Sequence, residues 1–295
     1  KNVSAESVSF TMVKGAGVRY GGQDGHNGLR FIAQMPVVDY EALESNPTYE
    51  AVNYGILIAP ADYHKSEPLT KAFEPNSSYA WAEWNNETGE WLYDEVENEG
   101  KTRIINLKAE EMTHSSEDAD TMILQGAITD ILPENIAREF VGIGYIETVS
   151  DGSFSYRFAE ENDNVRSIAY IAQCAVADTG ETAPDEAQKT WLQQNYIDTV
   201  SDVESEYKVE YYAENFGGEY EKIDTETYYS TIGAAVDYTP REMNGFIYDE
   251  ENPLSKTGDK VLANDKLLIK RYYNLFSSWN VTSESALKDT RLNVY

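Results

Sequence analysis

Cysteine is almost absent from the sequence, and this scarcity limits the chemistry that the chain can carry. The single cysteine, Cys174, excludes an intramolecular disulfide framework. It lies within the short helical run SIAYIAQCAVAD, where we expect a small buried hydrophobic residue rather than a nucleophile. A nucleophilic thiol needs a histidine partner, and the three histidines lie in polar, loop-like sequence (His26, His64 and His114). No spacing of histidine or cysteine suits a zinc site.

Positive charge is also scarce. The sequence has 23 lysines and arginines against 52 aspartates and glutamates, which gives a formal net charge of -29. Such a field repels nucleic acid and anionic membranes, so we exclude nucleic acid as a partner. No apolar run approaches the roughly twenty residues that a spanning helix needs, so membrane insertion is not expected. The sequence opens at Lys1 without a charged and apolar leader, and we expect that any signal peptide is removed or lies outside it.

The many carboxylates do not form a recognisable metal or catalytic motif. Three segments bring oxygen ligands close together, namely DADT (118–121), SDVESE (201–206) and DEEN (249–252). None of them fits the twelve-residue loop that binds calcium in EF-hands. We therefore predict no cofactor, with a structural calcium ion as the minor alternative.

The stretch from Tyr79 to Tyr93, YAWAEWNNETGEWLY, holds three of the five tryptophans. Thr88 and Gly89 interrupt it like a turn, and the alternation on either side indicates a β-hairpin. Flat rings interleaved with amides and carboxylates suit sugar recognition, because pyranose faces stack on aromatics while hydroxyls need polar partners. The candidate ligand-binding residues are Tyr79, Trp81, Glu83, Trp84, Asn85 and Trp91. The alternative is that these rings anchor the core of a β-sheet, as most tryptophans do.

Strand-like segments recur along the chain, and apolar and polar residues alternate in 6–13 and 207–230, which predicts a mainly β protein. Strands are expected over 28–35, 51–60, 102–109, 121–131 and 265–273, with hairpins around Ser150-Asp151-Gly152 and around Gly217-Gly218 in 207–230. Short helices are expected over 168–178, capped by Ser167, and over 184–196. The segment 61–78 is expected to be a long loop.

A polar, acidic stretch at 199–206 indicates a domain edge, and it divides the chain into three predicted parts. Residues 1–200 are expected to form a β-sandwich-like domain with a few short helices, which is the candidate glycan-binding domain. Residues 205–274 are expected to form a second, smaller module, and 275–295 a tail or linker.

The stretch 207–273 resembles a mucin-binding-protein-type (MucBP-like) repeat of Gram-positive surface proteins. The matching residues are Tyr207, Val209, Tyr211, Tyr212, Asn215, Gly218, Tyr220, Pro240, Gly245, Phe246, Tyr248, Leu267, Leu268, Lys270, Tyr272 and Tyr273. The segment ENPLSKTGDKVLAND departs from the pattern because it is longer than the usual loop. The resemblance implies a small β-grasp-like module of an extracellular stalk, and many such repeats are spacers that bind no mucin.

The N-terminal part resembles an uncharacterised region of exported clostridial cell-surface proteins. The matches are Gly28-Leu29-Arg30-Phe31, Tyr54-Gly55, Pro60-Ala61-Asp62-Tyr63, Arg138-Glu139-Phe140, Gly144-Tyr145-Ile146 and Arg166-Ser167-Ile168-Ala169-Tyr170. No catalytic residue is assigned to that pattern, so none is carried over. The segment 71–101, with its tryptophans, stands outside the matching motifs and is expected to form the protein-specific surface.

These observations predict a non-catalytic, extracellular adhesion protein, secreted or on the cell surface, that binds polysaccharide by aromatic stacking. A starch-like glucan or a host glycan fits equally, and we expect a monomer within a larger surface protein. One alternative is a structural stalk or protein–protein interaction module in which the tryptophans are buried. The other is a glycoside hydrolase, which needs two carboxyls facing each other across a cleft; Glu83, Glu87 and Glu90 are the candidates near the tryptophans.

Overall fold

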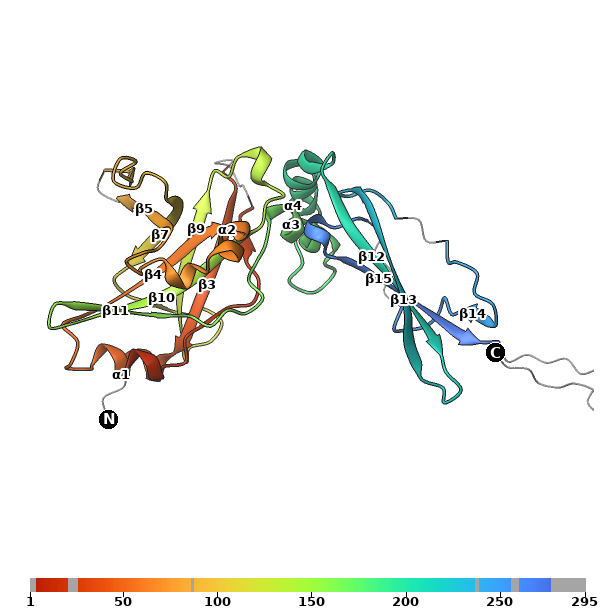
Figure 1. The fold of residues 1–295 in the computed structure, drawn as a ribbon, viewed down its shortest axis with the longest axis horizontal. Helices are drawn as coiled ribbons and strands as arrows, with labels where there is room; N and C mark the ends of the chain where they lie inside the picture. The colour runs from red at the N-terminus through yellow and green to blue at the C-terminus, as the bar shows by residue number, and fades with distance from the viewer. Residues whose placement is uncertain (1–3, 21–25, 86–87, 237–238, 256–259, 277–295) are drawn as a thin grey trace, which may run out of the picture. The chain divides into compact units, whose positions relative to one another are not determined.

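The protein is mainly β, as predicted (Figure 1). The computed structural model describes residues 4–20, 26–85, 88–236, 239–255 and 260–276. Glu87 and most of the predicted tail lie outside these residues. The chain forms two compact units: unit 1 comprises residues 1–203 with 262–264, and unit 2 comprises 204–261 with 265–295.

Unit 1 contains a first sheet whose strands are all antiparallel. Its order is β1 (Thr11–Met12), β3 (Gly28–Pro36), β9 (Thr121–Thr129) and β8 (Thr113–His114), with β2 (Gly17–Val18) also paired to β3. The strand predicted over 28–35 is present as β3, and Leu29, Phe31, Ala33 and Met35 are buried at every second position of it.

The second sheet of unit 1 is larger and carries the tryptophan-rich hairpin at one edge. Its order is β11 (Ser153–Phe158), β10 (Phe140–Ser150), β4 (Ala51–Pro60), β7 (Thr102–Ala109), β5 (Tyr79–Asn85) and β6 (Glu90–Leu92). The pair β5–β7 is parallel and the other pairs are antiparallel. Two inner strands, β4 and β10, contain long runs of consecutive buried residues, which is typical of strands covered on both faces.

Glycines in β10 let the two sheets approach closely. A Cβ added at Gly142 would lie 2.4 Å from the Phe31 ring, and one at Gly144 would lie 2.6 Å from the Cβ of Ala33. Because Phe31 and Ala33 belong to β3, the sheets pack face to face at this point. This arrangement is consistent with a β-sandwich.

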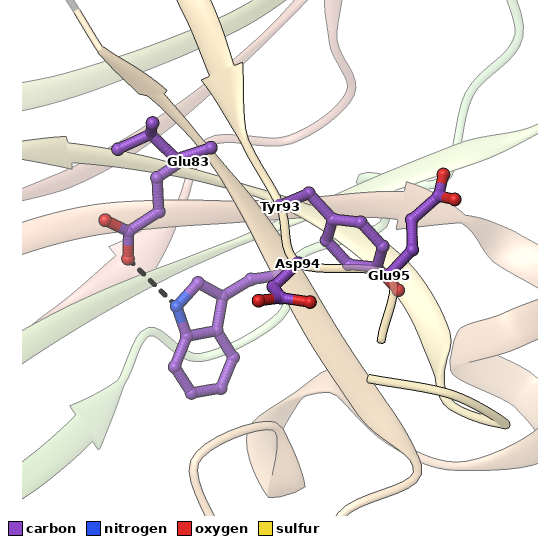
Figure 2. A pocket seen from close by; sticks show the side chains of 6 residues that line it. Glu83, Tyr93, Asp94 and Glu95 are labelled. Carbon is purple, nitrogen blue, oxygen red and sulfur yellow. Dashed lines mark hydrogen bonds between the residues drawn. The ribbon is translucent and has the colours of Figure 1, made fainter. Parts of the chain in front are cut away.

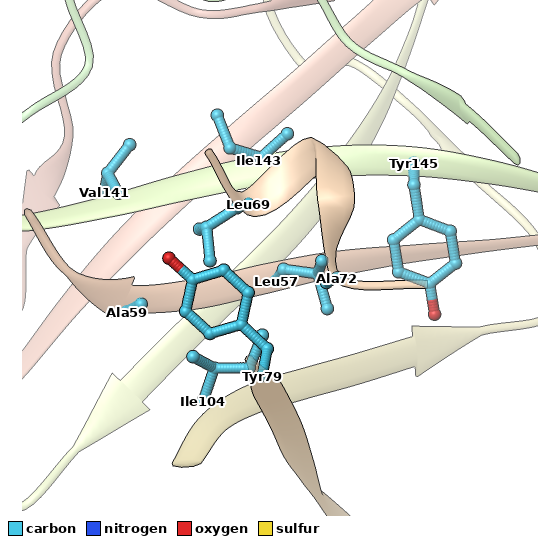
Figure 3. Packing of buried hydrophobic residues seen from close by; sticks show 9 residues of the cluster. All are labelled: Leu57, Ala59, Leu69, Ala72, Tyr79, Ile104, Val141, Ile143 and Tyr145. Carbon is cyan, nitrogen blue, oxygen red and sulfur yellow. The ribbon is translucent and has the colours of Figure 1, made fainter. Parts of the chain in front are cut away.

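The other face of the second sheet has its own core (Figure 3). The segment 61–78 covers it with helix α2 (Ala61–Ser66) and the 3-10 turn η2 (Leu69–Lys71). Leu69 and Ala72 are buried there against Tyr145 and its neighbours. The prediction of a long loop was therefore wrong in part, because short helical turns bring these apolar side chains onto the sheet.

The remaining helices of unit 1 are short. They are η1 (Ala5–Ser7), α1 (Val37–Glu44), η3 (Pro133–Asn135), α3 (Ile168–Ala177), α4 (Glu186–Leu192), the π-turn η4 (Gln193–Ile197) and η5 (Asp198–Val200). Ser167 caps α3 as predicted, since its hydroxyl accepts a hydrogen bond from the Tyr170 amide at 3.2 Å. Within the described residues, no helix combines the length and the apolar character that crossing a membrane requires.

Cys174 corrects one prediction. Helix α3 buries Ile168, Ala169 and Ala172, whereas Cys174 is exposed. Two residues along a helix correspond to a rotation of roughly 200°, so a side chain two positions after Ala172 points away from the core. The apolar neighbours in sequence suggested burial, but the helix has only one buried face.

Unit 2 is built on a third, mixed sheet. Its order is β13 (Tyr220–Thr231), β12 (Glu204–Glu214), β15 (Leu267–Leu275) and β14 (Phe246–Tyr248), in which β12 and β15 are parallel. The predicted hairpin between β12 and β13 is present, and Gly218 at its turn has a φ of 81°. The 3-10 turn η6 (Ala263–Asp265) precedes β15.

Candidate functional site

The hairpin β5–β6 separates the three tryptophans onto two faces. Trp84 is paired directly with Trp91, and Glu83 is paired with Leu92. Because neighbouring side chains of a strand point to opposite faces, Trp84 and Trp91 share one face while Trp81 and Glu83 occupy the other. The hairpin predicted around Gly89 is thus present, but its tryptophans do not form one platform.

Trp84 and Trp91 are the exposed members of the set. Their side chains are 44% and 40% exposed. The ring centroids lie 5.3 Å apart with an interplanar angle of 67°, an edge-to-face geometry. Each indole therefore supports the other while part of each ring stays in contact with solvent.

Both rings line a groove of about 840 Å³. Aliphatic side chains form much of its surface: Ile105 and Leu107 come from β7, and Ile128 comes from β9. In β7 the side chains alternate, so Ile105 and Leu107 are half-buried toward the groove whereas Ile104 is buried in the core of the other face. The groove thus combines an apolar surface with two large aromatic side chains.

Polar groups lie at the same groove, and they include Arg103, Asp130 and Asn135. Asp130 Oδ1 is 2.6 Å from His26 Nδ1, and this hydrogen bond lowers the pKa of the Asp130 carboxyl. An apolar surface with a few polar groups at its margin is the usual composition of a small-ligand site.

The opposite face of the hairpin carries a second, smaller concavity of about 560 Å³ (Figure 2). Its lining is acidic, and consists of Trp81, Glu83, Leu92, Tyr93, Asp94 and Glu95. Trp81 Nε1–H donates to Glu83 at 2.9 Å, the dashed line in the figure. The Trp81 ring also packs edge-on against Phe73, with centroids 5.1 Å apart, so this tryptophan is half-buried and fixed.

Glu83 is held by several donors. Besides Trp81, it accepts from Lys108 Nζ at 2.8 Å and from Asn106 Nδ2 at 3.4 Å. An ion pair and two hydrogen bonds give this carboxylate a structural role in joining β5 to β7.

Two other predicted site residues have structural roles. Tyr79 is 2% exposed, and its hydroxyl donates to the carbonyl oxygens of Tyr63, at 2.8 Å, and of Glu67. Burial raises the pKa of Tyr79 to about 12. Its inclusion among ligand-binding residues is therefore corrected, because the ring lies inside the core. Asn85 accepts a hydrogen bond from the Thr88 amide at 3.2 Å and so supports the turn.

The sequence did not reveal Arg103, Ile105, Leu107 or the β9 residues as neighbours of the tryptophans. They meet only because β7 pairs with β5 and because the two sheets pack together. The one local signal is the strand predicted over 102–109, since neighbouring side chains of a strand point to opposite faces. Among the described residues, no group of three or more histidine, cysteine, aspartate or glutamate side chains is placed to hold a metal ion.

Comparisons with protein-family models, with curated proteins and with solved structures gave no match to this chain. The fold and the two concave faces of the hairpin are therefore the observations from which a function can be inferred.

Proposed function

We propose that unit 1 is a non-catalytic saccharide-binding module that stacks sugar rings on Trp84 and Trp91. The observation that carries this proposal is the pairing of two partly exposed indoles on one face of a hairpin, at 44% and 40% exposure, beside an open groove. Monomeric proteins seldom leave two adjacent tryptophans in contact with water without a ligand or partner. Pyranose rings present apolar C–H faces that fit such a surface.

The groove also offers partners for hydroxyl groups. Arg103 and Asn135 carry donors, and Asp130 carries acceptors, next to the aromatic surface. Exposed stacking contributes on the order of 1 kcal/mol per ring, so we expect dissociation constants of roughly micromolar to millimolar for a saccharide of a few units. Affinity of this size suits a surface protein that engages a repeating polymer at many copies.

The proposal places this module in an extracellular Gram-positive surface protein. A β-sandwich-like unit 1 and a MucBP-like, β-grasp-like unit 2 would together form a binding domain followed by a spacer. Two features support this arrangement: the two facing sheets of unit 1 and the mixed four-stranded sheet of unit 2. Composition also supports an exported protein, because lysine and arginine are few and tyrosine is frequent.

A non-catalytic role is favoured over glycoside hydrolysis by the contacts of Glu83. A hydrolytic pair needs one carboxyl free to donate a proton and another free to attack or to activate water. Glu83 is instead committed to Lys108, Trp81 and Asn106. Release of reducing sugar from a polysaccharide panel by the purified chain would overturn this part of the proposal.

The stalk alternative keeps one specific observation in its favour. Trp81 and Tyr79 pack against the 61–78 segment, as core residues of a spacer domain would. If the whole hairpin is structural, Trp84 and Trp91 would have no ligand.

A glycan array and a pull-down on insoluble polysaccharides distinguish these proposals. We expect wild type to bind at least one saccharide and the double variant Trp84→Ala, Trp91→Ala to lose that binding. Val96→Ala is the matched control, because Val96 is 86% exposed and lines neither concavity. Equal retention of wild type and the double variant would remove the tryptophan pair as the platform. No retention of either protein by any saccharide would favour the stalk.

A further inference from the structure

Arg103 is the positively charged residue of the groove lining. It stands on β7 at the groove, and its guanidinium carbon lies 5.0 Å from the centroid of the Tyr93 ring. Within the described part of the chain, its side chain makes no ion pair and no hydrogen bond. Its guanidinium is thus stacked on an aromatic face while its N–H groups stay free.

Four other arginines are held by carboxylates, whereas Arg30 donates to the Gln125 side chain at 3.1 Å instead. Each of the following is paired with a carboxylate: Arg138 with Asp62, Arg157 with Glu160, Arg166 with Asp163, and Arg241 with Asp224 and Glu226. An arginine left without a carboxylate partner, next to two exposed indoles, is available for an anionic group of a ligand.

We propose that the groove binds a saccharide that bears a carboxylate, and that Arg103 binds that carboxylate while Trp84 and Trp91 stack on the sugar rings. This inference rests on the proposed saccharide-binding function and specifies its ligand class. The planar guanidinium matches a carboxylate through two parallel N–H···O hydrogen bonds, and stacking on Tyr93 fixes its plane.

The charges around the groove agree with this assignment. Asp130, the acidic residue of the groove lining, is hydrogen-bonded to His26 rather than to Arg103. The net charge of -29 opposes the approach of an anion from a distance. At physiological ionic strength that repulsion is screened beyond about 8 Å, so contacts inside the groove decide the binding.

A matched set of polymers tests the proposal with the full chain. Polygalacturonate supplies the carboxylate, and the same polymer after chemical reduction of its carboxyls is the neutral counterpart. Soluble starch is a second neutral polymer, and a sialyllactose conjugate presents the carboxylate on a host-type sugar. Affinity gel electrophoresis or titration calorimetry gives the dissociation constant for each.

Three variants distinguish the effect of the Arg103 guanidinium on binding from an effect on folding. Arg103→Gln removes the guanidinium, Arg103→Lys keeps the charge without the planar fork, and Lys101→Gln removes one nearby positive charge outside the groove lining. Circular dichroism of each variant verifies the fold.

We expect wild type to bind at least one carboxylate-bearing saccharide about tenfold more tightly than reduced polygalacturonate. Arg103→Gln should abolish that preference, Arg103→Lys should retain part of it, and Lys101→Gln should leave it unchanged. Equal binding of acidic and reduced polymer by wild type, or a preference unaffected by Arg103→Gln, would overturn the carboxylate assignment and leave saccharide binding intact. Binding of none of the four saccharides would overturn this assignment and weaken the proposed function with it.

Discussion

At the scale of single residues, the side of the strand decides what each tryptophan does. Trp81 and Trp84 are three positions apart on β5 and therefore face opposite ways. Trp81 packs on Phe73 and donates to Glu83, whereas Trp84 contacts Trp91 and solvent. Identical residue types in one short strand thus divide between stability and ligand contact.

This division predicts different stabilities for two alanine variants. Trp81→Ala should lower the free energy of unfolding by about 2 kcal/mol, because it removes a half-buried ring and leaves Glu83 without one donor. Trp84→Ala should lower it by less than about 1 kcal/mol, because Trp84 is 44% exposed and its removal uncovers less buried surface. Urea unfolding of both variants measures the difference, and a larger loss for Trp84→Ala would contradict the assignment.

Gly142 offers a second test at this scale. Gly142→Ala would place a Cβ 2.4 Å from the Phe31 ring, between the two sheets. We expect a loss of about 2 kcal/mol in urea unfolding, because neither sheet can move without disturbing its neighbours. Gly180→Ala is the control, since its nearest neighbour is the exposed Asp178 carboxylate at 3.2 Å, and it should change stability by less than about 0.5 kcal/mol. Similar losses for both variants would argue against the tight sheet contact.

At the scale of secondary-structure elements, local sequence patterns were sufficient to predict strands that have one buried and one solvent-facing side. The strands predicted over 28–35 and 102–109 and the hairpin predicted around Gly89 are all present. The segment 61–78 was missed because its helical turns are too short to show a period. The burial of its apolar residues can be recognised only when the sheet that they pack against is known.

Helix α4 provides a prediction for an element. The Asp185 carboxylate accepts from the Gln188 amide at 2.8 Å, and the Gln188 side chain accepts from the Asp185 amide at 2.9 Å, which completes a capping box. Asp185→Ala should lower the free energy of unfolding by about 1 kcal/mol. Glu181→Ala, in the preceding exposed loop, is the control and should have no measurable effect. Equal thermal unfolding of the two variants would show that the cap contributes nothing.

At the scale of the whole molecule, the sequence predicted a mainly β protein but not the groove. Trp84 and Trp91 could be identified as candidate ligand-binding residues from the aromatic-rich stretch in which they lie. Arg103 and Ile128 reach the same groove from β7 and from β9 of the other sheet, and nothing in the local sequence encodes that meeting. Long-range strand pairing and sheet packing therefore bring together the groove residues that the local sequence patterns did not reveal.

Buried tyrosines make a prediction for the whole fold. Burial raises the pKa of Tyr79 and of Tyr196 to about 12, and raises that of Tyr145 further. An unfolded tyrosine has a pKa of about 10, so these groups stabilise the fold fully below pH 10, and that contribution is lost as the pH rises through 12.

Alkaline titration tests whether burial raises the pKa of these tyrosines. Tyrosinate absorbance should rise in two phases, first from solvent-exposed rings and then, at higher pH, together with loss of near-ultraviolet circular dichroism. A single phase near pH 10 with the fold intact would contradict the burial of these rings.

The most direct test of the central claim is chemical protection of the tryptophans by a bound saccharide. N-bromosuccinimide oxidises accessible indoles, and peptide mass spectrometry assigns the modified residue. Trp84 and Trp91 should react quickly in the free protein and become protected when a saccharide identified on the glycan array is present, while Trp81 should react slowly in both states. Saccharide binding that leaves the oxidation of Trp84 and Trp91 unchanged would contradict the proposed platform.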